Sequence, residues 1–200
     1  MTPLLNAAPS VPPANLAFAR AREIRIGQER PGDIEAREAL LDEGFGPSRA
    51  AKTSARLRDG RLPAAGLALV AKDKSEVVGT LRCWNIDAGG RPALLLGPLA
   101  VAKSHRSLGL GAKLMREALW RAAMLGHKAV LLVGDAAYYQ RFGFDASLTS
   151  GLDLPGPVEA HRFLAFEIEP GALLGAEGIV VATGARDGDR WAGSMMLWAA

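Results

Sequence analysis

The sequence predicts an α/β domain, because strand-like and helical apolar patterns alternate along most of its length. Residues 94–101, LLLGPLAV, form a nearly continuous apolar run that is typical of a buried strand. Apolar residues then recur at helical spacing over 110–125, with charged residues between them, which predicts an amphipathic helix. Upstream, residues 67–71 and 77–86 are expected to form two strands of an antiparallel meander.

Composition narrows the class of protein. A chain of 200 residues with 49% hydrophobic content is long enough for one compact domain with a sizeable core. The net charge is only +3, and no block of basic residues with interleaved aromatics occurs, so the sequence does not favour a nucleic-acid partner. Cys83 is the single cysteine, which excludes an intramolecular disulfide and suits the reducing cytoplasm. No apolar stretch is long enough for a transmembrane helix, so we expect no membrane partner.

The first part of the chain is expected to be a tail, a strand and two helices. Residues 1–22 contain four of the twelve prolines and no acidic residue, which predicts a disordered tail. Residues 23–29 alternate apolar and polar side chains and predict a first strand. A helix with Ile34 on its apolar face is expected over 33–44, and a second helix over 49–58.

The last part of the chain is expected to close the sheet. Residues 129–133 predict a buried strand and residues 162–168 an alternating one. The domain therefore covers 23–169, and residues 170–200 form a C-terminal extension. A further strand is expected at 179–181, and the apolar end of the extension would pack either on the domain or on a second copy, as a homodimer.

Pro98 interrupts the apolar run of the fourth strand. Proline has no N–H group, so a regular central ladder would lose a donor there. A bulge, or a local separation of neighbouring strands, would tolerate it. The sheet is therefore expected to part near this residue.

The loop after that strand has the pattern Arg106-x-x-Gly109-x-Gly111 and leads directly into the amphipathic helix. Glycines at the first turn let a ligand approach the backbone closely. The free N–H groups at that end of the helix carry the positive end of the helix dipole. The loop therefore predicts a site for an anion such as a pyrophosphate.

This loop resembles the acyl-coenzyme A signature of the GNAT superfamily of N-acetyltransferases, [RQ]-x-x-G-x-[GA]. Residues 138–144, YYQRFGF, resemble a second GNAT box, aromatic-Tyr-x-x-aromatic-Gly-Phe. A short glycine pattern recurs by chance, but the two boxes stand here in the order that the family requires. The resemblance implies a mixed, mainly antiparallel sheet with helices on both faces and a splay between its fourth and fifth strands.

The resemblance also implies acetyl-coenzyme A as co-substrate, an amine as acceptor, and no metal. The pantetheine arm would lie in the splay, along the backbone of Leu99, Ala100 and Val101. The residues implied for the pyrophosphate loop are Arg106, Ser107, Leu108, Gly109, Leu110, Gly111, Ala112 and Lys113. In the family the helical pair that falls here at residues 33–62 overhangs the acceptor site, so this segment is expected to shape the choice of acceptor.

Tyr139 matches the family tyrosine that protonates the departing thiolate, while Tyr138 is expected to pack. A phenol suits that role because a thiolate leaving in an apolar cleft develops charge. The fourth strand carries no carboxylate that could serve as general base. Asp87, Glu43 and Asp135 are other candidates for that role, but none of them belongs to a recognised motif.

Two other residues with reactive side chains are expected to play no catalytic part. His105 lies in the basic loop and is expected to be solvated. Cys83 is expected to be a small apolar filler on its strand, since transfer in the family resembles direct attack of the amine without an acyl-enzyme.

Other functions are compatible with parts of the pattern. The missing base leaves open a coenzyme A-binding domain without catalysis, and a second alternative is an acyltransferase that uses a longer acyl donor in the same cleft. Dinucleotide binding is disfavoured because the pattern G-x-G-x-x-G is absent and the strand before the loop follows an antiparallel meander.

Overall fold

The computed structural model describes residues 23–46, 49 and 51–188. Its strands are β1 (Ile24–Gln28), β2 (Ala68–Asp73), β3 (Glu76–Asp87), β4 (Pro92–Val101), β5 (Ala129–Val133), β6 (Leu152–Asp153), β7 (Phe163–Glu167), β8 (Gly178–Ile179) and β9 (Val181–Ala182). Its α-helices are α1 (Ile34–Phe45), α2 (Thr53–Arg56), α3 (Leu110–Met124) and α4 (Ala136–Tyr139). Short 3-10 turns are η1 (Pro31–Asp33), η3 (Lys103–His105), η4 (Gln140–Phe142), η5 (Ser147–Thr149) and η6 (Ala160–Arg162).

The main sheet has the order β1-β2-β3-β4-β5-β7, with β9 beside β3. All neighbouring strands in it are antiparallel except β4 and β5, which are parallel. The meander predicted for 67–86 is β2 and β3, joined by a turn in which Lys74 has a positive φ of 57°. The mixed, mainly antiparallel sheet is therefore confirmed.

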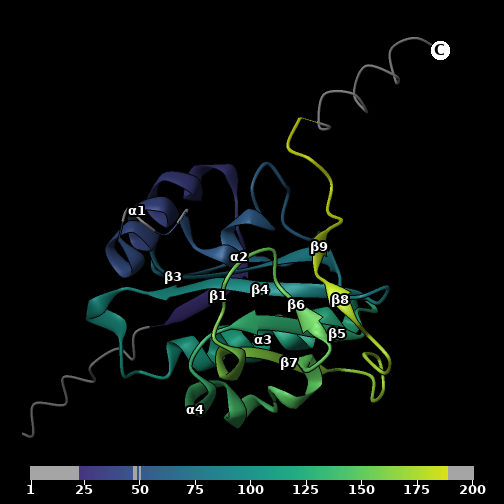
Figure 1. Cartoon of the computed structure of the whole chain (residues 1–200). Coiled ribbons are helices and arrows are strands. Elements are labelled where there is room, and N and C mark those ends of the chain that lie inside the picture. The colour runs from purple at the N-terminus through teal and green to yellow at the C-terminus, as the bar shows by residue number, and fades with distance from the viewer. Residues whose placement is uncertain (1–22, 47–48, 50, 189–200) are drawn as a thin grey trace, which may run out of the picture.

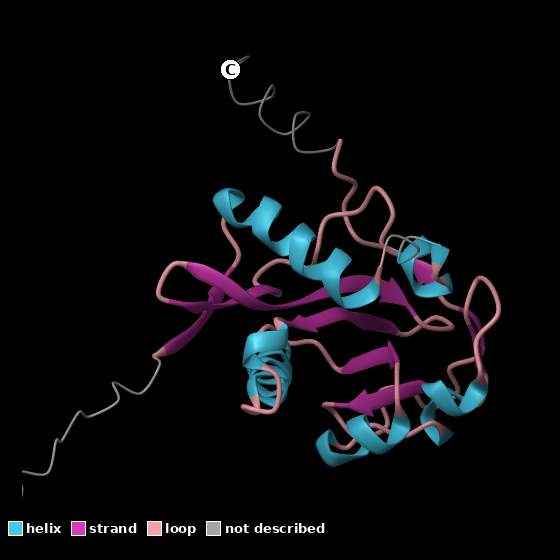
Figure 2. Cartoon of the chain, turned by 90° about the vertical axis from the view of Figure 1, so that its left-hand side faces the viewer, coloured by secondary structure: helices cyan, strands magenta, loops and turns pink. Residues whose placement is uncertain are grey.

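Helices cover both faces of this sheet, as Figures 1 and 2 show: α1 and α2 lie on one face, and α3 and α4 on the other. The alternation along β3 explains why both faces are apolar, since Cys83 packs in the α3 cluster and Trp84 in the opposite one. The buried face of α3 consists of Leu110, Leu114, Met115, Ala118 and Ala122. The helix expected over 110–125 is confirmed; it ends at Met124, and Gly126, with a positive φ of 80°, follows its C-cap residue.

The two early helices differ in detail from the prediction. In α1 the buried residues are Arg37, Leu40 and Leu41, whereas Ile34 is 46% exposed, so its expected place on the apolar face was wrong. Ile34 is the first residue of α1, and the buried side of the helix begins one turn later at Arg37, whose guanidinium forms an ion pair with Glu29. The second helix is only the four residues of α2, much shorter than 49–58.

The C-terminal extension adds two short strands where one was expected. β8 pairs with β6, and β9 pairs with β3 beyond the end of β2, at Ile86↔Ala182 and Asp87↔Val181. Leu173, Ala176 and Val180 share a buried cluster with residues of β3 and β5, so residues 170–188 pack against the domain. The predicted tail, residues 1–22, and the apolar end of the extension, 189–200, lie outside the described residues.

None of the helices described by the structure is long and apolar enough to cross a membrane.

Candidate active site

β4 and β5 part after a short shared stretch, as the position of Pro98 predicts. They pair only at Leu94↔Val130 and Leu95↔Leu131, although β4 continues to Val101. β5 turns its other edge to β7 and pairs with it over all five of its residues. Among the described residues, the second half of β4 therefore pairs with no strand on its β5 side, and we call this separation of the two strands the opening.

A bulge in β4 marks the start of this opening. Cys83 of β3 faces Leu96, but Leu81 faces Leu99, so Gly97 and Pro98 together oppose a single residue. The Gly97–Pro98 peptide is cis, and Gly97 has a φ of 125°. The indole nitrogen of Trp84 donates a hydrogen bond of 2.7 Å to the Gly97 carbonyl. This bond holds the bulge against β3.

The backbone alternation of β4 decides which groups face the opening. Ala102 N donates to Val78 O of β3, so Ala100, two residues before it, also turns its backbone towards β3. Leu99 and Val101 then turn theirs away from β3. The Val101 carbonyl accepts a hydrogen bond of 3.2 Å from Arg106 Nε, in agreement with that orientation. Ala100 instead packs its methyl group against α1.

The loop that follows β4 leaves the start of α3 without a side-chain cap. Gly109 is the N-cap residue, in the left-handed region with φ 71°, and no side chain caps the helix. The first N–H to bond within the helix is that of Lys113, to Gly109 O at 3.0 Å. The N–H groups of Leu110, Gly111 and Ala112 therefore point out of the helix end, as anion binding requires.

The other predicted loop residues surround this helix end. Arg106, Ser107, Leu108 and Lys113 are exposed, and Ser107 has a positive φ of 65°. Leu110 is buried in the α3 core, so only its backbone is available to a ligand.

His105 is buried rather than solvated, so that expectation was wrong. Its side chain is 4% exposed, with Nδ1 2.8 Å from Ser104 Oγ and Nε2 3.2 Å from Asp73 Oδ2. Asp73 is the last residue of β2, so the contact ties the loop to the meander. The tertiary contact supplies a partner that the loop sequence does not reveal.

Tyr139 packs its ring into the α3 side of the core at the end of β5. A methyl group placed on Gly134 would lie 2.2 Å from Tyr139 Cε2, so the ring lies directly against the backbone there. Phe144 packs against the ring edge-on, with 6.0 Å between centroids. The Tyr139 hydroxyl makes no hydrogen bond to any described residue. Since every fully buried polar side-chain atom of the described residues has a hydrogen-bond partner, this hydroxyl is not fully buried. Burial of the ring raises the pKa of Tyr139 to about 12, with Tyr138 and Asp135 adding to the rise.

Tyr138 points the other way, towards the start of α3. A methyl group placed on Gly111 would lie 3.0 Å from the Tyr138 hydroxyl oxygen and 3.8 Å from Val101 Cγ2. Its ring lies 4.2 Å below the guanidinium of Arg141 and edge-on to Tyr139. The two tyrosines therefore reach different parts of the site, one at the end of β5 and the other at the glycine loop.

The acidic residues without a motif all have structural partners. Asp135 Oδ1 accepts from Ala137 N at the start of α4, and Asp87 Oδ1 accepts from Gly90 N in the turn after β3. Glu43 forms an ion pair with Lys103 at 3.3 Å. None of them is placed in the opening by these contacts, so no general base is assigned.

A buried ion-pair network lies on the α1 face and was not predicted. Glu29 accepts from Arg37 of α1 and, at 2.9 Å, from Arg82 Nε of β3. Burial raises the pKa of Glu29, although Arg37 beside it acts in the opposite direction. The Arg82 guanidinium also lies over the ring of Trp84, 5.8 Å from its centroid. Glu29 follows β1, Arg37 lies in α1 and Arg82 lies in β3, so these charges meet only in the folded chain and the sequence offers no signal for them.

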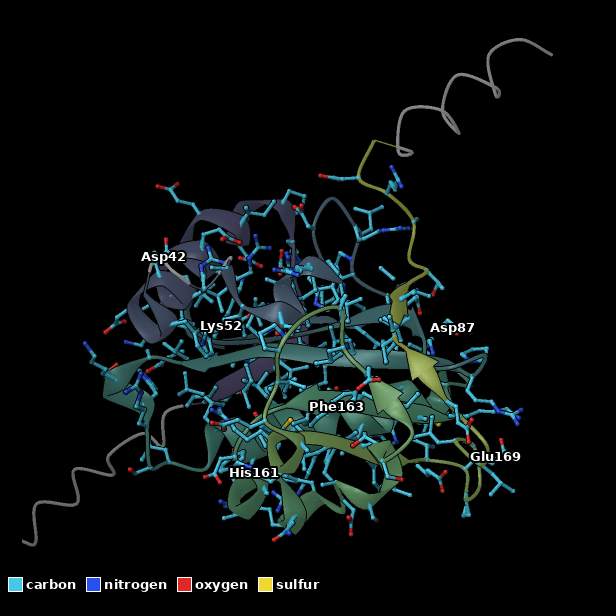
Figure 3. The ribbon with its side chains drawn as sticks, viewed as in Figure 1. Asp42, Lys52, Asp87, His161, Phe163 and Glu169 are labelled. Carbon is cyan, nitrogen blue, oxygen red and sulfur yellow. The ribbon has the colours of Figure 1, made fainter. Side chains whose placement is uncertain are left out.

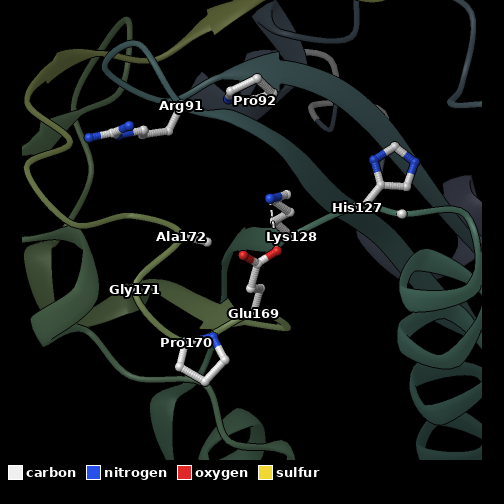
Figure 4. A pocket seen from close by; sticks show the side chains of 9 residues that line it. Arg91, Pro92, His127, Lys128, Glu169, Pro170, Gly171 and Ala172 are labelled. Carbon is white, nitrogen blue, oxygen red and sulfur yellow. Dashed lines mark ion pairs between the residues drawn. The ribbon is translucent and has the colours of Figure 1, made fainter.

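A cavity of about 470 Å³ lies at the opposite end of β4 and β5 from the opening (Figure 4). Lys128 and Glu169 form an ion pair across it at 2.9 Å, and Arg91 donates to Leu174 O. Its lining is Arg91, Pro92, Gly126, His127, Lys128, Glu169, Pro170, Gly171 and Ala172. It contains none of the predicted site residues. Within the described residues, no group of three or more His, Cys, Asp or Glu side chains is arranged to hold a metal ion.

This chain is similar in sequence and fold to proteins of the acetyltransferase family. A family model described as an acetyltransferase (GNAT) domain matches residues 64–146. The uncharacterized N-acetyltransferase YhbS of Escherichia coli K12 is 31% identical over 157 residues, which cover 78% of this chain and 93% of YhbS. YjhQ of the same strain, also an uncharacterized N-acetyltransferase, is 29% identical over 124 residues, or 59% of this chain and 68% of YjhQ.

Solved structures agree with the sequence comparison. The crystal structure of E. coli YhbS in complex with CoA matches with a TM-score of 0.67 and 33% identity, over 80% of this chain and 88% of that one. A GNAT family acetyltransferase of Brucella melitensis in complex with acetyl-CoA matches with a TM-score of 0.58 and 25% identity, over 83% and 94%. With the parted strands and the glycine loop at the start of α3, these likenesses show that the chain belongs to the GNAT superfamily of N-acetyltransferases.

Proposed function

We propose that this protein transfers the acetyl group of acetyl-coenzyme A to an amine by direct attack. One observation carries the proposal: the opening between β4 and β5 lies beside a helix start with unbonded N–H groups and no side-chain cap. The complexes of YhbS with CoA and of the Brucella enzyme with acetyl-CoA support the same donor for this chain.

The residues of the opening fit the parts of the donor. The N–H groups of Gly111 and its neighbours would bind the pyrophosphate, and a positive φ at Gly109 turns the backbone into the helix without a side chain in the way. The outward backbone groups of Leu99 and Val101 would pair with the amides of the pantetheine arm, as a missing strand would. Ala100 lies between these two residues, and we assign it to the same pantetheine-binding segment although its own N–H and C=O groups face β3.

Tyr139 would supply the proton to the leaving group. The amine nitrogen attacks the thioester carbon, the C–S bond breaks, and the sulfur takes the proton of the Tyr139 hydroxyl. The proton lost by the amine goes to water. With a pKa of about 12 the phenol remains protonated throughout the physiological range and is therefore available as an acid.

Location and assembly complete the proposal. Cys83 is buried and unpaired, which suits a reducing compartment, and we place the protein in the cytoplasm. Trp120 and Met124 lie one turn apart on α3 and are 60% and 70% exposed, so this face is available to a second copy in a homodimer.

The test is steady-state release of free thiol from acetyl-coenzyme A with a panel of amines, alongside calorimetric binding of the donor. We expect donor binding and amine-dependent release. Tight binding without release for any amine would point to a non-catalytic binding domain, and faster release from longer acyl donors would reassign the acyl group. Absence of donor binding would overturn the proposal.

A further inference from the structure

His105 is a buried polar residue to which the proposed reaction assigns no part. It lies in η3, between the end of β4 and the donor loop, residues 106–111. Its side chain is only 4% exposed, although Lys103 and Ser104 beside it are exposed. Burying an imidazole is unfavourable unless its nitrogens are hydrogen-bonded, so the partners of this ring hold it inside the protein.

Both ring nitrogens of His105 have partners. Nε2 lies 3.2 Å from Asp73 Oδ2, and Nδ1 lies 2.8 Å from Ser104 Oγ. A carboxylate can only accept, so Nε2 donates to Asp73, and the Ser104 hydroxyl can serve Nδ1 either as donor or as acceptor. The imidazole therefore joins the segment before the donor loop to the end of β2.

Asp73 is a fixed anchor because it lies within the sheet. It pairs with Ile24 of β1 on one side and with Glu76 of β3 on the other. The backbone of His105 is bonded as well, since its N–H group donates to Ala102 O at 2.9 Å. His105 is thus fixed through both its side chain and its main chain.

The donor loop that follows His105 has a conformation that needs such support. Ser107 has a φ of 65°, which is unfavourable for a residue with a side chain, and Gly109 follows at φ 71°. The side chain of Ser107 is exposed, and Arg106, also exposed, bonds to Val101 O at 3.2 Å. His105 is therefore the buried anchor directly before the loop.

We propose that His105 is a positioning residue for the donor: by bonding to Asp73, it holds the donor loop in the shape that points the N–H groups at the start of α3 towards the pyrophosphate. This inference rests on the proposed function, because it needs acetyl-coenzyme A as the donor. The buried imidazole acts through the backbone of the loop. Its effect should therefore be confined to the pyrophosphate and should not extend to the pantetheine arm, which pairs with β4.

The experiment compares two ligands on the full chain by calorimetry: CoA, which has the pyrophosphate, and pantetheine, which lacks it and is measured by competition with CoA. His105→Ala should weaken CoA binding by roughly 10- to 100-fold, as for the loss of one hydrogen bond to a charged group, and leave pantetheine binding unchanged. Dephospho-CoA keeps the pyrophosphate and should lose as much affinity as CoA. A general loss of stability would not separate the ligands in this way.

Further variants test the contact between His105 and Asp73. His105→Gln places an amide N–H near the position of Nε2 and should restore most of the CoA affinity, whereas His105→Asn reaches only the position of Nδ1 and should not. Asp73→Ala should weaken CoA binding about as much as His105→Ala. The double variant should lose no more affinity than either single one, because both remove the same contact.

Thr149→Val and His161→Ala are the matched controls. Thr149 is as buried as His105, and its hydroxyl donates to Phe163 O at 2.8 Å, so its replacement should lower the Tm and leave CoA affinity unchanged. His161 is an exposed histidine just before Phe163, which begins β7 (Figure 3). Both controls act at β7, which pairs with the edge of β5 away from β4.

Three results would overturn the inference alone: wild-type CoA affinity in His105→Ala, an equal loss for CoA and pantetheine, or an equal loss of CoA affinity in Thr149→Val. Should His105→Ala fail to fold, His105→Gln and His105→Asn decide, and equal CoA affinity in those two overturns the inference. Failure of the wild-type protein to bind CoA overturns the proposed function and this inference with it, whereas CoA binding without transfer to any amine overturns the catalytic proposal only.

Discussion

Replacing Tyr139 by Phe should slow acetyl transfer about 100-fold while leaving donor affinity unchanged. The variant keeps the ring, which lies against Gly134 and Phe144, and removes only the hydroxyl. A loss of about 100-fold is within the range of a positioned acid and corresponds to roughly 2.7 kcal/mol of transition-state stabilisation.

The pH dependence should carry the signature of the raised pKa. A phenol with a pKa of about 12 is ionised to roughly 1% at pH 10, whereas an ordinary tyrosine with a pKa of about 10 is half ionised there. The protonated form is the active one, so activity that depends on Tyr139 should persist to about pH 11 and fall only as the pH approaches 12. In Tyr139→Phe this high-pH decline should be absent.

The assay is kcat against pH with a saturating acceptor, together with calorimetric affinity for acetyl-coenzyme A. Tyr138→Phe is the control, and it should change kcat little because its hydroxyl lies at the start of α3 rather than at the end of β5. A larger loss in Tyr138→Phe than in Tyr139→Phe would move the acid by one position. Full activity in both variants would show that water protonates the thiolate.

Gly109→Val should weaken acetyl-coenzyme A binding more than tenfold by calorimetry, since a β-branched residue is strained at φ 71°. The control is Gly90→Val, at φ 82° in a remote turn, which should cost similar stability and leave the affinity for acetyl-coenzyme A unchanged. Equal affinity losses in both would contradict the loop assignment. Gly134→Ala should lower kcat about as much as Tyr139→Phe, because its methyl group must displace the Tyr139 ring, and a wild-type rate would show that the position of the ring does not matter. Burial raises the pKa of the Cys83 thiol to about 12, so alkylation by iodoacetamide at pH 8 should require unfolding, and rapid labelling of the folded protein would contradict its burial.

The patterns that predicted the fold are local ones. A strand alternation, a helical period, a proline without an N–H and a glycine loop all act on neighbouring residues, so β2, β3, α3 and the bulge at Pro98 follow from short stretches of sequence. The two GNAT boxes could be recognised for the same reason, because each is a short contiguous run.

The features of the site that only the tertiary structure determined are contacts between residues distant in the sequence. Buried His105 contacts Asp73, and Glu29 accepts a hydrogen bond from Arg82. Tyr138 and Tyr139 face opposite ways, the first towards Gly111 and the second towards Gly134. No local pattern records such pairs, because they form only when strands and helices close on one another. The sequence by itself determined the family, the donor loop and the helix behind it; the closing of strands and helices on one another decided which way the two tyrosines face and which charges are paired, since those partners meet only in the folded chain.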